Sequence, residues 1–538
     1  MKQIEQKNYG SALYTLVMVF FFWGFLAASN GIFIPFCKTH FQLTQFESQL
    51  VDSAFYGAYF IGSLLLYLIS TSVGYDVLNR IGFKNGIVCG LVISVIGAAC
   101  MIPAVNSGEY MLILGSFFVI ALGFSLQQTA ANPFAIALGD PATGAHRLSL
   151  AGGVNSLGTT VGPIIVTLVL FGTVVASQEQ VNNASISSIN SLYMILGGVF
   201  LLVAGIFAAA NMPSVTSSEG YEKSGKATKT MLMITGAIVA LIMVGNFLPD
   251  FAGLYTNIIL LTIAVISVVG ILLSANSSAQ KSSIGWGAMK YPQLVLGMIA
   301  IFVYVGVEVG IQSNMGALLK TPQFGGLDES QISHFISLYW GSLMIGRWTS
   351  AVTVFNVKKS TKTILTVVVP FITFGVVLAA NWLSGNNVSD LYMYAVCIVI
   401  LIAANFWAQE KPAKLLMILG ILGVLAMTIG LLFTGTIGLF AFISGGLVCS
   451  IMWPCIFALS ITGLGKFTSQ GSAFLIMMIL GGGIIPPLQG GLADLTDIHS
   501  SYIIPVLCFA YLAFFAWKVG HILKKQNLRF ENTEVTAH

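Results

Sequence analysis

Long apolar runs alternate with short polar segments along the whole chain, and this alternation predicts a series of membrane-spanning helices. A helix needs about 20 consecutive apolar residues to cross the hydrocarbon core of a bilayer. Runs of that length begin near Leu13, Val51, Ile87, Met111, Leu150, Ser191, Met231, Leu254, Leu294, His334, Ile364, Leu391, Leu415, Ile437, Ala473 and Tyr502. We therefore predict an all-α polytopic membrane protein with about 16 spans.

Composition strengthens this prediction. Hydrophobic residues make up 56% of the 538 residues, charged residues make up 8%, and the mean hydropathy is +0.90. Soluble domains carry about 25% charged residues, so a soluble protein is excluded. The first apolar run is too long for the core of a signal peptide and lacks a small-residue cleavage site, so we expect it to remain as a helix.

The basic residues lie between the apolar runs and orient them. If the N-terminus is cytoplasmic, all of the 23 Lys and Arg residues except Lys38 and Lys320 fall on or near the inner side. Cytoplasmic loops carry this excess in membrane proteins, and one span more or fewer would invert every later loop. We therefore expect a multi-pass protein of the cytoplasmic (inner) membrane with both termini in the cytoplasm and membrane lipid around it. The net charge of +4 is explained by these basic cytoplasmic loops, so it does not indicate a nucleic-acid partner.

Eight motifs in order give the chain a resemblance to a known transporter family. They are FFFWGFLAASNGIFIP (Phe20–Pro35), QLVDSAFYGAYF (Gln49–Phe60), QQTAANPF (Gln127–Phe134), HRLSLAGGVNSLGTTVGP (His146–Pro163), YPQLVLGMIAIFVYVGVEVGI (Tyr291–Ile311), YWGSLMIGR (Tyr339–Arg347), SIMWPCIFALSITGLG (Ser450–Gly465) and GGGIIPPLQGGLAD (Gly481–Asp494). The chain resembles the fucose–glucose–galactose permease family of the major facilitator superfamily, and its Glu308 motif is similar to the glucose/galactose branch. The resemblance implies two six-helix bundles that rock around a midplane site.

That family has 12 spans, so about four predicted helices are additional. We expect an N-terminal bundle over 1–211, a cytoplasmic linker over 212–229, and a C-terminal bundle over 276–362 and 409–538. The surplus forms two helical hairpins, at 230–275 and 363–408, which enter and leave from the cytoplasm. Neither hairpin carries a charge in mid-span, so we interpret both as peripheral and lipid-facing. In the loop between the second and third spans, Asp76 and Arg80 lie four residues apart and are expected to pair.

Glu308 lies about halfway along the seventh span of the two-bundle scheme. A charge at the centre of a span costs about 2.5–3.5 kcal/mol, so its presence needs a reason. Gln312 follows one turn later, with Asn314 just beyond it. We interpret Glu308 as a sugar-hydroxyl acceptor, a cation-coupling carboxylate, or both. The alternative is a neutral structural acid that is hydrogen-bonded between helices.

The fourth span carries the amides Gln127, Gln128 and Asn132 directly before Pro133, which kinks a helix by removing a backbone donor. Gln128 and Asn132 share a helix face. An amide both donates and accepts hydrogen bonds, which suits sugar hydroxyls. The alternative is that these amides join helices to one another.

Five further residues complete the predicted substrate site. They are Asn30 in the first span, Asn155 in the fifth, Trp340 in the eighth, Trp453 in the tenth, and Gln489 in the eleventh. Aromatic faces stack on the apolar C–H faces of pyranoses, although Trp is also a routine membrane-interface anchor.

The chain departs from the fucose permeases at residues that matter for coupling. Those permeases carry Asp, Glu and Gln where this chain has Gly31, Gln128 and Gly152. The resemblance assigns the lost carboxylates to proton movement, so a proton-symport mechanism does not transfer directly. Glu308 and Asp52 are our candidates for ion coupling. The alternative for Asp52 is a water-exposed residue at a helix N-terminus, favoured by the helix dipole.

These observations predict a secondary active transporter for a hexose of the glucose or galactose kind, coupled to H⁺ or Na⁺. One alternative is an uncoupled sugar facilitator, and another is a membrane sugar sensor or scaffold that does not transport. The chain lacks Walker A, HExxH and GxSxG motifs and clusters with metal-ligand spacing, so we expect no enzyme activity, cofactor or metal. We expect a monomer.

Overall fold

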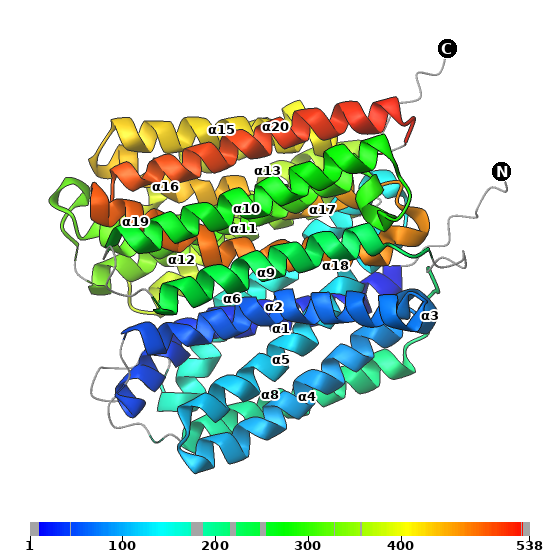
Figure 1. Ribbon diagram of the computed structural model, residues 1–538. Helices are drawn as coiled ribbons and strands as arrows, with labels where there is room; N and C mark the ends of the chain where they lie inside the picture. Colours follow the sequence, from blue (N-terminus) through cyan, green and yellow to red (C-terminus); the bar gives the residue numbers. More distant parts are fainter. Residues whose placement is uncertain are drawn as a thin grey trace.

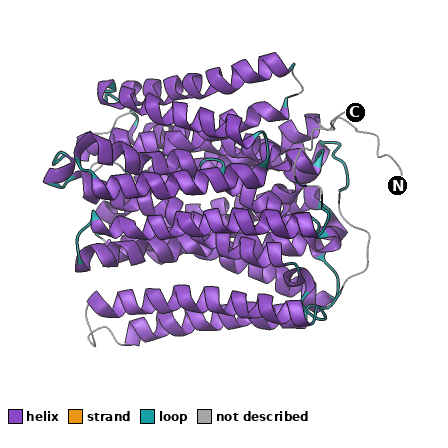
Figure 2. Ribbon diagram, turned by 90° about the horizontal axis from the view of Figure 1, so that it is seen from above, coloured by secondary structure: helices purple, strands orange, loops and turns teal. Residues whose placement is uncertain are grey.

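The computed structural model describes residues 10–42, 45–173, 185, 187–215, 222–247, 254–327, 329–355, 358–528 and 530. Within these ranges the regular structure is helical and contains no strand (Figure 2). Fifteen helical segments, some of them made of consecutive helices as in Gly435–Ile461, are long and apolar enough to cross a membrane. The remaining predicted span is α12 (Glu329–Ala351), which is equally long but less apolar because it carries Ser, His and Arg residues. The prediction of an all-α multi-pass membrane protein is confirmed.

The first half of the chain forms one helical bundle, drawn in blue and cyan in Figure 1. Its helices are α1 (Gly10–Phe41), α2 (Gln45–Val73), α3 (Val77–Ile81), α4 (Phe83–Ser107), α5 (Tyr110–Ala137), α6 (Gly144–Phe171) and α8 (Ser187–Ala209). Helix α1 packs along α6 and needs glycine there, because a Cβ on Gly158 would lie 2.1 Å from the Phe21 carbonyl oxygen. Small residues let membrane helices approach closely, and here they bring α1 against the wall of the site.

The second bundle is drawn in green to red and lies beside the first (Figure 1). Its helices are α11 (Pro292–Leu319), α12, α15 (Pro412–Leu432), α16 (Gly435–Cys449), α17 (Met452–Ile461), α18 (Thr468–Met477), α19 (Gly481–Leu495) and α20 (Ile503–Lys525). Helix α11 packs against α12, α16, α17, α19 and α20. The central position of α11 places Glu308 between the two bundles.

Four further helices flank the second bundle. They are α9 (Gly225–Phe247) and α10 (Leu254–Lys281), then α13 (Lys359–Leu383) and α14 (Ala395–Ala408). Helix α10 packs against both α19 and α9. Helix α13 packs against α12, and α14 packs against α15 and α16. The first pair extends beyond the predicted limits of 230–275 at both ends. Large apolar side chains such as Ile242, Ile266 and Ile372 are exposed on these helices.

The bundles are joined by hydrogen bonds at the end of the molecule that holds α3, on the right in Figure 1. We call this the α3 end. The Ser469 hydroxyl donates to the Asp76 carboxylate at 2.6 Å, and the Asn79 amide donates to the Lys466 carbonyl oxygen at 3.0 Å. Asp76 also accepts from the Asn79 backbone N–H and so caps α3. The expected Asp76–Arg80 pair is therefore wrong, because the Arg80 guanidinium lies 4.2 Å over the Tyr75 ring instead.

Two prolines leave backbone carbonyls free for contacts between helices. Proline has no N–H, so the carbonyl four residues earlier loses its helical partner. Pro133 frees the Thr129 carbonyl, which accepts a 2.7 Å hydrogen bond from Ser472 of the second bundle. Pro454 frees the Ser450 carbonyl at the break between α16 and α17. The first contact joins the two bundles, and the second shapes the site.

Candidate functional site

A cavity of about 180 Å³ lies between the two bundles near the middle of the spans. Its lining comes from α1, α2, α5 and α6 on one side and from α11, α12 and α17 on the other. Apolar and aromatic groups dominate the walls, with a few convergent polar groups, as in small-molecule sites.

A buried ion pair occupies the second-bundle side of the cavity. An Nη2 hydrogen of Arg347 on α12 is donated to Glu308 Oε1 on α11 at 3.4 Å, and the Tyr304 hydroxyl donates to the same oxygen at 2.7 Å. The two charged side chains are only 11% and 13% exposed. Removing one partner of a buried ion pair is strongly destabilising, because the remaining charge is buried without a counter-charge. Each charge therefore requires the other at this depth.

Arg347 also reaches across to the first bundle. Its guanidinium donates to the Ser156 hydroxyl at 2.9 Å and to the Gly152 carbonyl at 3.3 Å, both on α6. Its Nε donates to the Ser450 carbonyl that Pro454 frees, at 3.2 Å. Gly152 makes room for this crossing, because a Cβ there would lie 3.2 Å from Arg347 Cδ. Arg347 thus ties together α6, α11, α12 and the α16–α17 break.

The first-bundle side of the cavity is built from neutral amides. The Gln128 amide donates to the Tyr59 hydroxyl at 2.9 Å. The amide nitrogen of Asn132 is buried without a hydrogen-bond partner, so a donor remains available. Asn155 donates to the Phe20 carbonyl at 3.0 Å, and its side-chain oxygen lies 3.4 Å from Arg347 Nη1. These amides offer both donors and acceptors to a polar ligand.

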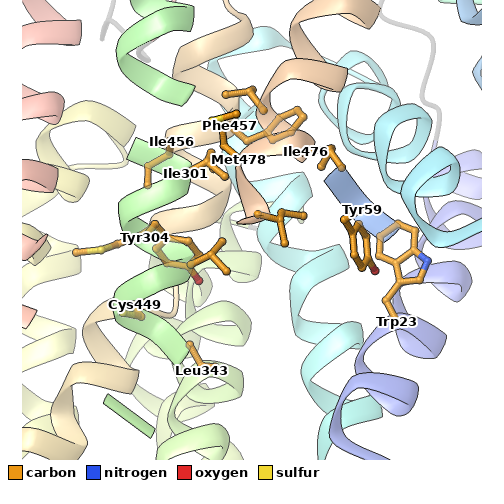
Figure 3. Close-up of a cluster of buried hydrophobic side chains, with 14 of the residues drawn as sticks. Trp23, Tyr59, Ile301, Tyr304, Leu343, Cys449, Ile456, Phe457, Ile476 and Met478 are labelled. Atoms are coloured by element: carbon orange, nitrogen blue, oxygen red, sulfur yellow. The ribbon is translucent and has the colours of Figure 1, made fainter. Parts of the chain in front are cut away.

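Aromatic rings line both sides of the cavity. The Trp23 indole donates to Gln127 Oε1 at 3.1 Å, which fixes the ring against the first bundle. Trp453 stacks on Phe457 with ring centroids 6.0 Å apart and tilts against Tyr304 at the same separation. Figure 3 shows Trp23 and Tyr59 across from Tyr304. The cavity therefore presents flat apolar faces beside its polar groups.

A layer of apolar side chains separates the cavity from the α3 end. The layer contains Ile301, Ile456, Phe457, Ile476 and Met478, which are fully buried and belong to one hydrophobic cluster (Figure 3). They come from α11, α17, α18 and the 3₁₀ turn Met478–Leu480. Together with the hydrogen bonds at the α3 end, this layer closes the passage between the bundles on that side.

Six of the predicted substrate residues line the cavity. They are Gln128, Asn132, Asn155, Glu308, Trp340 and Trp453. Gln127 is fully buried behind the wall, between Trp23 and Ser94. The side chains of Asn30 on α1 and of the coupling candidate Asp52 on α2 lie outside the described residues.

Three other predicted residues lie away from the cavity lining, toward the end of α11 opposite the α3 end. Gln312 is half-buried one turn beyond Glu308. Asn314 donates to the Gly310 carbonyl at 3.0 Å. Gln489 is fully buried near Gly310, and neither amide atom has a hydrogen-bond partner. Substrate binding by these three residues stays a prediction.

Sequence reasoning missed four residues of the site: Tyr59, Trp23, Tyr304 and Arg347. Tyr304 could have been predicted, because it lies four residues before Glu308 and residues four apart on a helix share a face. Arg347 was counted among the cytoplasmic cations, since it lies near the inner end of its span. The cost of an unpaired charge at Glu308 was the available signal that a cation must lie nearby. Among the described residues, no group of three His, Cys, Asp or Glu side chains is placed to hold a metal.

Comparisons with known proteins place the chain among sugar transporters. It is 32% identical to the glucose/galactose transporter of Brucella abortus (strain 2308) over 95% of this chain and 94% of the relative. It is 30% identical to the putative glucose/galactose transporter of Helicobacter pylori (strain J99 / ATCC 700824), over 94% and 96%. Identity to the L-fucose-proton symporter of Escherichia coli (strain K12) is 25%, over 95% and 94%. No protein-family model matches the chain.

The fold is also that of a solved transporter. The crystal structure of FucP, a major facilitator superfamily transporter in the outward conformation, matches with a TM-score of 0.64 at 23% identity, over 95% of this chain and 99% of that one. At this identity the match establishes the fold alone.

Proposed function

Because the chain belongs to the fucose–glucose–galactose permease family of the major facilitator superfamily, we propose that it is a secondary transporter that moves a hexose by alternating access. Its relatives are transporters, which confirms the expectation that it is not an enzyme. The observation that carries the proposal is the cavity between the bundles, with amides on one wall and an ion pair on the other. Sites for transported substrates lie at such repeat interfaces near the midplane.

The substrate we propose is glucose, galactose or a close relative. Gln128, Asn132 and Asn155 supply donors and acceptors for hydroxyl groups, and the unpartnered Asn132 amide favours a ligand that accepts a hydrogen bond there. Trp453 supplies a flat face for the C–H side of a pyranose. The relatives from Brucella abortus and Helicobacter pylori carry glucose and galactose in their names.

Coupling to H⁺ would run through Glu308. When Glu308 is ionised, Arg347 pairs with it while also holding α6. Protonation of the carboxyl would remove the charge that attracts the guanidinium and so loosen the link between α11 and α12. The L-fucose-proton symporter among the relatives supports this ion. Na⁺ coupling, and a part for Asp52, remain alternatives within the same proposal.

The described conformation would be the outward-facing one. The hydrogen bonds at the α3 end and the apolar layer behind Tyr304 close one side of the cavity. The excess of Lys and Arg predicts that this side is cytoplasmic. Opening it would require the contacts of Asp76 with Ser469 and of Thr129 with Ser472 to break together.

An uncoupled facilitator is the second candidate, favoured by the wall of the first bundle. That wall carries Gln128, where the fucose permeases have a carboxylate. A transporter without an ion-linked carboxylate equilibrates its substrate and cannot concentrate it.

The test is sugar uptake into proteoliposomes with H⁺ and Na⁺ gradients imposed separately and a panel of hexoses. We expect a glucose-type sugar to accumulate when a proton gradient is applied. Equilibration without accumulation would establish the facilitator instead. If the sugar binds and neither uptake nor counterflow occurs, the protein is a sensor and the transport proposal fails.

A further inference from the structure

A second cavity, of about 370 Å³, lies at the α3 end on the outer side of the second bundle. Its walls are the additional helices α9 and α10 and the segment that follows them. Polar groups in its lining are Lys226, Lys229 and Thr230 from α9, Ser274 and Ser278 from α10, and Trp286. No residue of this cavity belongs to the sugar site, so its ligand must be sought separately.

The two lysines give the cavity uncompensated positive charge. Lys226 and Lys229 lie three residues apart and so project on the same side of α9. No ion pair joins either of them to an acidic residue in the part of the chain that the structure describes, whereas the nearby Lys290 and Lys466 share Glu222 at 3.7 and 3.6 Å. Lys226 Nζ lies 5.9 Å over the Trp286 ring, a contact that does not neutralise its charge. An anion placed here would therefore meet two ammonium groups that have no carboxylate partner among the described residues.

Neutral hydrogen-bond donors surround this charge. Ser274 and Ser278 are one turn apart on α10 and both are exposed. Trp286 is 7% exposed, and its buried indole N–H has no hydrogen-bond partner. A buried donor left unpaired costs about 1–3 kcal/mol. The indole is therefore a second and independent indication that a polar ligand belongs at this site.

Deeper in the membrane the lining becomes apolar. Met233 lies one turn beyond Lys229, and Gly270 and Ile271 lie opposite on α10. Gly270 has no neighbour within 4 Å of the position a Cβ would take, so open space follows the helix. A free phosphate would gain nothing from this part of the cavity. A molecule with an anionic head and a hydrocarbon tail would fill both parts.

The polar wall is held in place without a ligand. The backbone N–H groups of Lys226 and Ala227 donate to the Gly285 carbonyl, next to Trp286. Ser224, just before α9, is buried and accepts from Gln470 at 2.9 Å. Groups that are already ordered lose less entropy when a ligand binds.

We propose that this cavity binds an anionic phospholipid, with its phosphate at Lys226 and Lys229 and an acyl chain along Met233 and Ile271. Basic pockets between membrane helices on the cytoplasmic side recognise such headgroups. The inference goes beyond sugar transport and assigns a ligand to the additional α9–α10 helices.

The test measures lipid binding to the purified full-length protein in detergent by native mass spectrometry, with phosphatidylglycerol, phosphatidylcholine and inorganic phosphate as separate probes. We expect phosphatidylglycerol to bind more tightly than the other two. Each lysine near an anionic surface contributes about fivefold in affinity, so Lys226→Gln with Lys229→Gln should weaken binding by about 25-fold. The matched control is Lys223→Gln with Lys281→Gln, which removes two exposed lysines near the same end that do not line the cavity.

A second variant, Ser274→Trp, fills the cavity and leaves all lysines in place, so it should also abolish specific binding. Equal binding of phosphatidylcholine would overturn the proposal. So would equal losses in the cavity and control lysine variants, which would indicate general surface attraction. Binding of inorganic phosphate as tight as that of the lipid would exclude the acyl-chain assignment and overturn it too. Sugar uptake plays no part in this readout, so the two proposals fail independently.

Discussion

The two bundles contribute unlike walls to one cavity. The second bundle supplies the charged pair of Glu308 and Arg347, whereas the described wall of the first bundle is made of aromatic rings and amides such as Gln128 and Asn155. At this cavity the first bundle meets charge through the hydrogen bonds that Arg347 donates to Ser156, Gly152 and the Asn155 side-chain oxygen on α6. In the proposed transporter, this difference would divide ion coupling and sugar recognition between the halves, with Arg347 as the link.

The same contrast appears in the backbone. Pro133 leaves α5 as one continuous helix, and its freed Thr129 carbonyl bonds across the interface to Ser472. Pro454 instead follows a break between α16 and α17, and its freed Ser450 carbonyl holds Arg347 within the second bundle. Pro133 thus supports a hydrogen bond between the two bundles, whereas Pro454 supports a hydrogen bond to Arg347 in the charged wall.

The largest expected effect comes from breaking the ion pair. Arg347→Ala leaves the Glu308 carboxylate buried without a cation and should destabilise the protein by about 3–5 kcal/mol. Thermal unfolding of the detergent-purified protein measures this. Combining Arg347→Gln with Glu308→Gln removes both charges and should recover most of the loss. A single variant that unfolds at the wild-type temperature would show that the pair does not stabilise this wall.

The next largest expected effect is a variant that still exchanges sugar across the membrane but no longer couples sugar movement to the proton gradient. Glu308→Gln keeps an acceptor for the Tyr304 hydroxyl but cannot be protonated or ionised. Under a proton gradient we expect the accumulation ratio of the sugar to fall to about 1, while counterflow continues. Asp497→Asn, in an exposed loop, is the matched control and should accumulate sugar normally. If the Glu308 variant still accumulated sugar, another residue would have to couple the ion to sugar movement, and Asp52 would be the first candidate.

The amide wall should give smaller effects that do not depend on the ion. Gln128→Ala removes one hydrogen bond of about 0.5–1.5 kcal/mol, so KM for the sugar should rise about two- to tenfold. The ratio of uptake with and without a proton gradient should be unchanged. Asn405→Ala removes an amide on α14 that bonds only its own helix, and it serves as the control. A change in ion dependence for the Gln128 variant would contradict the division between the two walls.

The smallest expected effect concerns Asp76 at the α3 end. Among the described residues, it is the one carboxylate of the first bundle that is hydrogen-bonded to the second bundle. Burial raises the pKa of Asp76 above its usual 3.8, against the opposing effect of hydrogen bonds from Ser469 and backbone N–H groups. The folded state therefore binds this proton more tightly than the unfolded state, and stability declines as pH rises from 3.8 through the raised pKa. Asp76→Asn keeps an acceptor for Ser469 and should remove that part of the decline.

Thermal unfolding of both proteins over a pH series measures the difference. Identical pH profiles for the wild type and the Asp76 variant would show that the Asp76 carboxyl does not titrate in this range.

Some of the site was accessible from local spacing. Gln128 and Asn132 lie four residues apart, and the structure places both at the cavity as a shared helix face requires. Glu308 was found because a charge in mid-span is costly wherever it lies. Arg347 was not found, because its position near a span end made it look like a loop cation. The guanidinium reaches inward on a long side chain, and that direction is set by Gly152 and the Ser450 carbonyl rather than by sequence position.

The sequence by itself determined the all-helical class, a count of about 16 spans, the family, and which residues are too polar for lipid. These properties follow from the length of apolar runs and from the cost of burying polar groups, both of which are local. Only the tertiary structure decided which polar groups meet. Asp76 binds Ser469 rather than Arg80, and Glu308 binds Arg347 from another helix, 39 residues along the chain. Such pairings depend on how helices pack against one another, and in a membrane that packing is selected by close fit and hydrogen bonds across the chain.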